Sequence, residues 1–153
     1  MNENINNSII KDCGFNVKGK GFVFNLDKYS CHERLTGKCF VNDSDYHGLD
    51  NDKMGSGDSR FDYCPLIAKS IIDRGFNDSI YSIRITKYAC GHYGIEDGQH
   101  RICISHKLNI PITVYLESDD KNDCYVCEMC KSHLGFRIRS LLGKGRYHIV
   151  NFR

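Results

Sequence analysis

The chain has 153 residues, of which 41% are hydrophobic and 11% aromatic, and its formal net charge is +2. This length suits one domain, and the apolar content excludes an intrinsically disordered chain. The near balance of charge gives no general case for nucleic-acid binding, and no apolar run approaches the ~20 residues that span a bilayer.

The first half of the chain alternates between polar segments and short apolar runs. We expect residues 1–12 to form a disordered polar tail and residues 21–26 to form the first strand. Residues 42–62, rich in Asp, Gly, Ser and Asn, predict a long loop. Apolar residues at helical spacing predict a helix over 65–74, which Gly75 would end.

The second half predicts further strands and one more helix. Strands are expected over 79–86, 93–96 and 110–116, with a helix over 99–108. Segments 136–142 and 146–152 predict a hairpin across the glycines of 143–145. This order of elements indicates the α+β class.

The start of the chain lacks the basic and apolar regions of a secretion signal. We therefore expect a cytoplasmic protein without membrane contact, in which the nine cysteines are reduced. Their odd number also argues against a complete disulfide framework.

The predicted strand at 93–96 runs through a glycine turn into the predicted helix, which begins near Gln99. The first backbone N–H groups of a helix have no partner within it and carry the positive end of the helix dipole. Arg101 adds a planar charged group suited to phosphate oxygens. The turn Gly98, Gln99, His100 and Arg101 therefore predicts a phosphate site, while Asp97 would bind Mg²⁺ or cap the helix.

From residue 66 to 116 the chain resembles the ParB/sulfiredoxin superfamily of nucleotide-binding domains. The resemblance is carried by a helix at 66–71, a strand at 81–85, the turn Asp97-Gly98-Gln99-His100-Arg101 and the segment 111–114. In that superfamily the Gly-x-x-Arg segment binds nucleotide phosphates. The resemblance implies a compact mixed sheet with flanking helices over 13–120, followed by a Cys-rich, basic extension over 121–153.

Within the superfamily, the segment Leu26-Asp27-Lys28…His32-Glu33 is most similar to the free serine kinases. This implies a phosphotransferase that uses ATP or ADP with Mg²⁺ on a small hydroxyl compound such as serine. Glu33 would be the catalytic base, with Asp97 and His100 also in the catalytic group and His32 at the substrate. Gln99 stands where sulfiredoxins have a reactive cysteine, so sulfinic-acid repair is not expected.

The sequence leaves several interpretations of these residues open. Glu33 is also typical of an acidic residue exposed to solvent, and His32 is also typical of a histidine in a loop. From residue 131 onward there are six basic residues and no acidic one, so this end could cover a nucleotide or contact DNA. The alternative function is accordingly a nucleotide-binding or DNA-associated regulator without catalysis.

Four metal-binding residue types follow one another at intervals of three: Cys124, Cys127, Cys130 and His133. Zinc takes four sulfur or nitrogen ligands in a tetrahedron, so this spacing predicts a structural Zn²⁺ site. Such tight spacing strains one segment, and the earlier cysteines at 31, 39 and 64 are alternative ligands. The other interpretation is a set of reduced, packed thiols, as expected for cysteines 13, 90 and 103.

Overall fold

The computed structural model describes residues 9–25, 31, 33, 39, 41, 63–75, 83–142 and 146–153. Within these residues a six-stranded mixed sheet and four helices form, which confirms the α+β class. Predictions for the tail at 1–8, the loop at 42–62, the first part of the strand at 79–82, the turn at 143–145 and His32 lie outside the described residues.

The sheet has the strand order β1-β5-β3-β4-β2-β6. Its strands are β1 (Ile10–Phe15), β2 (Gly21–Phe24), β3 (Ile83–Tyr88), β4 (Tyr93–Asp97), β5 (Ile112–Asp119) and β6 (His148–Asn151). β3 is parallel to β5 and β2 to β4, whereas the β1–β5, β3–β4 and β2–β6 pairs are antiparallel.

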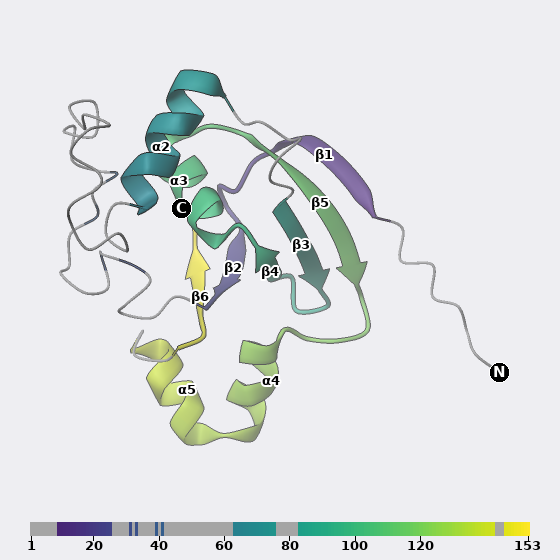
Figure 1. Ribbon diagram of the computed structural model, residues 1–153. Coiled ribbons are helices and arrows are strands. Elements are labelled where there is room, and N and C mark those ends of the chain that lie inside the picture. The colour runs from purple at the N-terminus through teal and green to yellow at the C-terminus, as the bar shows by residue number, and fades with distance from the viewer. Residues whose placement is uncertain are drawn as a thin grey trace.

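The helices form two pairs that lie apart from each other in Figure 1. They are α2 (Tyr63–Arg74), α3 (Gln99–Leu108), α4 (Tyr125–Ser132) and α5 (Leu134–Leu141). α2 contacts α3, and α4 contacts α5. No helix in the described part of the chain is long and apolar enough to cross a lipid bilayer.

The main core fills the space between the sheet and α3. Ile83 and Ile85 point to the same face of β3 and are buried, in keeping with the two-residue period of a strand. They pack with Phe22 of β2, Ile102 of α3 and Val114 of β5. A smaller core joins α2 to α3 through Ala68, Ile71 and Ile104.

The predicted C-terminal hairpin is wrong. Residues 134–141 form helix α5, and β6 pairs with β2, which precedes it by more than a hundred residues. The alternation Phe136-Arg137-Ile138-Arg139 suggested a strand, but Leu134, Ile138 and Leu141 also fit one face of a helix. Local periodicity could not decide between the two, and the distant partner of β6 was not visible in the pattern.

Strand β1 begins inside the segment expected to be a disordered tail. Ile10 pairs with Leu116 and Lys11 with Tyr115 of β5. Residues 10–14 are mostly exposed, because β1 is an edge strand, and this weakens the apolar pattern that would reveal it.

Candidate functional site

A tight hairpin between β3 and β4 carries the first two residues of a candidate metal centre. The N–H of Gly91 donates to the carbonyl of Tyr88 at 2.9 Å, and the N–H of Tyr88 donates to the carbonyl of His92 at 2.9 Å. Gly91 has φ 79°, a left-handed conformation that favours glycine. The turn therefore places Cys90 and His92 on either side of a residue that lets the chain reverse.

The start of α4 carries the other two residues. Cys124 is the N-cap and Cys127 lies in the first turn, and residues three apart share one face of a helix. The loop before α4 is held by the Asp119 carboxylate, which accepts hydrogen bonds from the backbone N–H groups of Lys121 and Asn122. The N–H of Ala89 donates to the carbonyl of Asn122 at 2.9 Å, which ties this loop to the β3–β4 hairpin.

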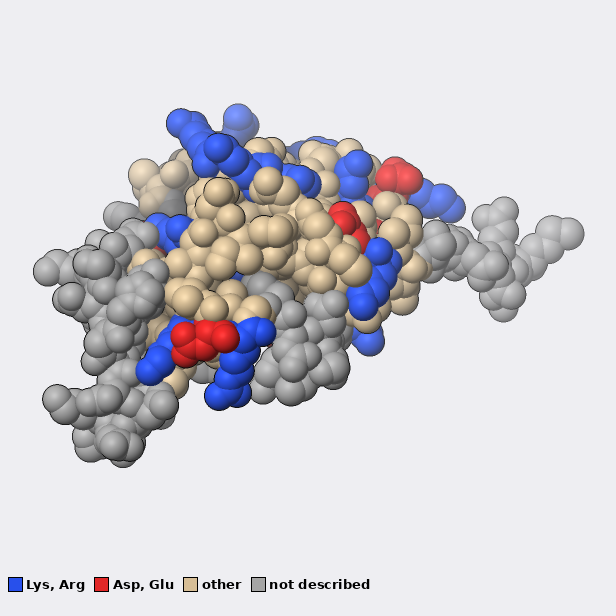
Figure 2. All heavy atoms as spheres, turned by 90° about the horizontal axis from the view of Figure 1, so that it is seen from above, with Lys and Arg blue, Asp and Glu red and all other residues tan. Residues whose placement is uncertain are grey.

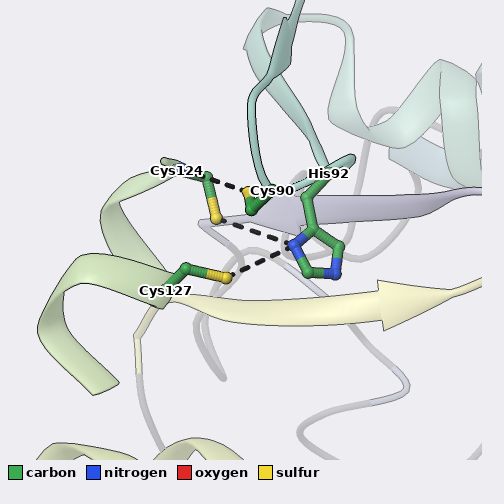
Figure 3. Close-up of side chains that lie close together, drawn as sticks. All are labelled: Cys90, His92, Cys124 and Cys127. Atoms are coloured by element: carbon green, nitrogen blue, oxygen red, sulfur yellow. Dashed lines mark hydrogen bonds between the residues drawn. The ribbon is translucent and has the colours of Figure 1, made fainter. Parts of the chain in front are cut away.

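The four side chains converge, as Figure 3 shows. The ligand atoms of Cys90, His92, Cys124 and Cys127 all lie within 4.8 Å of one another. Nδ1 of His92 is 3.4 Å from Sγ of Cys127 and 3.9 Å from Sγ of Cys124. Sulfur and nitrogen bound to one tetrahedral zinc ion are separated by about 3.6 Å, so the group could bind a metal such as zinc.

The three thiols differ in their ease of ionisation. Burial raises the pKa of the Cys90 thiol, but backbone N–H groups of Cys124 and His92 donate to its sulfur and bring the pKa below its ordinary value. Burial raises the pKa of Cys124. Burial, followed by the hydrogen bond that the Cys127 thiol donates to the sulfur of Cys124, raises the pKa of Cys127 to about 12. Ionising all three together needs a compensating positive charge, which a divalent cation supplies.

Gly21 of β2 makes room for the imidazole of His92. A Cβ atom at Gly21 would lie 2.7 Å from Cδ2 of His92 and 2.6 Å from Oδ1 of Asn151. No ordinary Cβ contact is this short, so the absence of a side chain at residue 21 allows the ring to lie where it meets the thiols.

This group shares two members with the set expected from the sequence. Cys130 and His133 are absent from it and belong to the later part of α4 and the break before α5. Six helical residues rise about 9 Å, so Cys130 is too far along the axis to share an ion with Cys124. The other two members lie in Cys90-Gly91-His92, between two predicted strands, where the sequence pattern predicts only an ordinary cysteine.

A cavity of about 490 Å³ adjoins the candidate metal centre. Gly94 and Glu96 of β4 and Thr86 of β3 line it on the sheet, and Cys124 contributes to its wall. Its lining is completed by Val23, Asn25, Tyr88, Ile95, Gln99, Tyr125 and Tyr147.

Three tyrosines border this cavity, and one basic side chain lies close to it. The rings of Tyr125 and Tyr147 meet edge to face at 5.3 Å between centroids. The Arg146 guanidinium lies 5.6 Å from the centre of the Tyr147 ring, and its Nε donates to Oδ1 of Asn25 at 2.9 Å. The cavity therefore combines aromatic surface with amide groups, one carboxylate from Glu96 and a neighbouring cation.

The three side chains of the predicted phosphate turn have different partners. Oε1 of Gln99 accepts a hydrogen bond from the Asn25 N–H at 2.6 Å, and Gln99 lines the cavity. Nδ1 of His100 lies 3.0 Å from Sγ of Cys64 on α2, and burial lowers the pKa of His100. Arg101 forms an ion pair of 2.8 Å with Asp97.

The backbone of this turn is as expected from the sequence. Gly98 is buried with φ 97°, and a Cβ there would lie 3.0 Å from Cγ1 of Ile83. α3 then begins at Gln99, where the helix was predicted to start. Glu33, the expected base, has an exposed side chain that does not line the cavity.

No known protein-family model matches the chain, and neither the curated proteins nor the solved structures give a significant match.

Proposed function

We propose that the cavity binds ATP or ADP beside a structural zinc centre, and that the domain transfers the terminal phosphoryl group to a small hydroxyl compound such as free serine. The observation that carries the proposal is the meeting of two helix starts at one cavity, where Gln99 begins α3 and Cys124 caps α4. The first N–H groups of both helices favour a bound anion.

The size and lining of the cavity suit a nucleotide. Its volume of about 490 Å³ falls within the range of small-molecule sites. Tyr88, Tyr125 and Tyr147 offer aromatic surface for the base. Arg146, held by Asn25, provides a charged group for the phosphates from the basic extension.

Zinc acts structurally in this proposal. Four protein ligands complete a tetrahedral coordination, which is typical of structural and not of catalytic zinc. The ion would join the β3–β4 hairpin to the start of α4. Because Tyr88 and Tyr125 come from these two segments, zinc would fix the distance between two walls of the cavity.

Two carboxylates are candidates for the acidic residue that would assist phosphoryl transfer. The resemblance implies Glu33 as base, whereas Glu96 is the carboxylate that lines the described cavity. Either would orient the attacking hydroxyl or bind Mg²⁺, because phosphoryl transfer depends mainly on position and charge neutralisation. Separate Glu33→Gln and Glu96→Gln variants distinguish the two roles.

Calorimetric titration with ATP and ADP, followed by an assay for phosphoserine with Mg²⁺ and serine, tests the proposal. We expect binding by the wild type, weaker binding by Arg146→Ala, and unchanged binding by Arg137→Ala, which removes an exposed arginine of α5. Wild-type protein that binds neither nucleotide would refute the site. Binding without phosphoserine or nucleotide turnover would refute the kinase activity alone.

A second candidate is a nucleotide-binding or DNA-associated regulator without catalysis. The exposed Arg137 and Arg139 of α5 favour it. On the face seen in Figure 2, however, Lys and Arg side chains of the described residues form several separate groups with acidic side chains between them. DNA retention that falls steeply with salt would support this function, and no retention at low salt would exclude the DNA contact.

A further inference from the structure

A second pair of metal-binding side chains lies where α2 meets α3. Cys64 in the first turn of α2 and His100 in the first turn of α3 bring Sγ and Nδ1 to 3.0 Å. Both side chains are partly buried, and the two helices share the small core of Ala68, Ile71 and Ile104. Packing of the two helices therefore fixes this thiol–imidazole pair.

Three more cysteines lie around this pair. Cys39 and Cys64 both pack against the small core, and Cys31 and Cys103 both pack against the main core. The thiols of Cys31, Cys39, Cys64 and Cys103 are near enough to one another to interact electrostatically. Burial first, and then negative charge on Cys31 and Cys39, raises the pKa of Cys64 to about 12.

We propose that Cys31, Cys39, Cys64 and His100 form a second metal site, which binds Zn²⁺ or a chemically similar soft divalent cation. Three thiolates and one imidazole are a common donor set for structural zinc. The ligands come from widely separated parts of the sequence, so the ion would cross-link α2, α3 and the chain that precedes α2. Each thiol that ligates releases its proton to solvent when the metal binds.

The second site is less tightly gathered than the first. Among the described residues, Cys90, His92, Cys124 and Cys127 are the one group of three or more such side chains placed closely enough to hold a metal ion, with their ligand atoms within 4.8 Å of one another. The pair Cys64–His100 is already at ligand spacing, and metal binding would draw Cys31 and Cys39 toward it. We therefore expect the second site to bind zinc more weakly than the first.

The number of zinc ions bound per chain tests this assignment. It is measured on purified full-length protein that has been equilibrated with zinc and freed of the excess. We expect about two ions for the wild type and about one for Cys64→Ser or Cys127→Ser. The double variant should bind none, and Cys13→Ser, which removes an exposed thiol of β1, should keep both. A wild type with a single ion that Cys64→Ser retains would overturn the proposal.

A second measurement needs no variant that could fail to fold. Wild-type protein is alkylated with and without a strong chelator, and modification at each cysteine is quantified by mass spectrometry. Bound metal should lower the rate of alkylation at Cys31, Cys39 and Cys64 at least tenfold. Cys13 should be alkylated at the same rate in both samples. Equal reactivity of these three thiols in the two samples would contradict the second site.

Discussion

The first turns of α3 and α4 are alike in their backbone capping but differ in what their side chains contact. Neither helix start is capped by a side-chain hydrogen bond, with Gly98 as the N-cap of α3 and Cys124 as that of α4. In α4, Cys124 and Cys127 both face His92. In α3, consecutive side chains interact with a strand end, another helix and a nearby carboxylate.

The spacing of the residues explains this difference. Residues three apart lie on one face of a helix, whereas neighbours are rotated by about 100°. A Cys-x-x-Cys pair can therefore hold one ion through its side chains. In a run such as Gln99-His100-Arg101 the three side chains point in different directions, so each contacts a different partner.

The largest effect is expected from the first metal centre. Cys127→Ser removes one of the four ligands of the proposed zinc site. We therefore expect loss of zinc from this site and a large drop in unfolding temperature, because binding of structural zinc contributes directly to folding free energy. Thermal unfolding and zinc content measure both.

Cys130→Ser is the matched control, three residues further along the same helix. It should retain the zinc of the first centre, since Cys130 is not among the four converging residues. Equal zinc loss in the two variants would show that the ion is held along α4, as the sequence spacing suggested.

A smaller effect is expected when the space for His92 is filled. Gly21→Ala places a Cβ against the imidazole, so we expect weaker zinc binding in competition with a chelator and a loss of about 1–3 kcal/mol in stability. Gly14→Ala in β1 is the control, because a Cβ there meets nothing within 4 Å. Similar zinc affinity in both variants would mean that the ring is not a ligand.

The first turn of α3 gives a third, weaker test. If Gln99 faces the nucleotide, Gln99→Ala should reduce ATP affinity roughly 3–10-fold, the value of one hydrogen bond. Arg101→Ala should change it less, because the guanidinium is engaged by Asp97. The reverse order in calorimetric titration would support the sequence-based assignment of Arg101 to the phosphates.

The smallest effect concerns the loop before α4. The Asn122 side chain, then the backbone N–H groups of Asn122 and Lys121, hold the pKa of Asp119 below its ordinary value. The folded-state pKa is thus below the unfolded one, so this stabilisation is present above the unfolded pKa and is lost as pH falls through the folded one.

Chemical unfolding between about pH 2 and pH 6 tests this. The wild type should have a higher free energy of unfolding than Asp119→Asn, and the difference should shrink as the pH falls. Asp120→Asn, which removes an exposed neighbouring charge, should follow the wild type. An advantage that does not change with pH would exclude the charge of Asp119 as its cause.

Patterns within one segment could be predicted from the sequence, and pairings between distant segments could not. Helix α3 and the strand before it follow from local periodicity and a glycine turn. Of the four ligands predicted from one segment, Cys124 and Cys127 belong to the converging group, whereas Cys130 and His133 do not. Cys90 and His92 were missed because their partners lie more than thirty residues away. The neighbours of His100 on α2 were hidden for the same reason, since tertiary packing decides which face of α3 meets which thiol.

X-ray diffraction at the zinc absorption edge from crystals of the zinc-loaded protein tests the central claim most directly. We expect an anomalous peak bonded to Sγ of Cys90, Cys124 and Cys127 and to Nδ1 of His92. A peak bonded instead to Cys130 and His133, or no peak beside the β3–β4 hairpin, would contradict the metal centre and the cavity wall that depends on it.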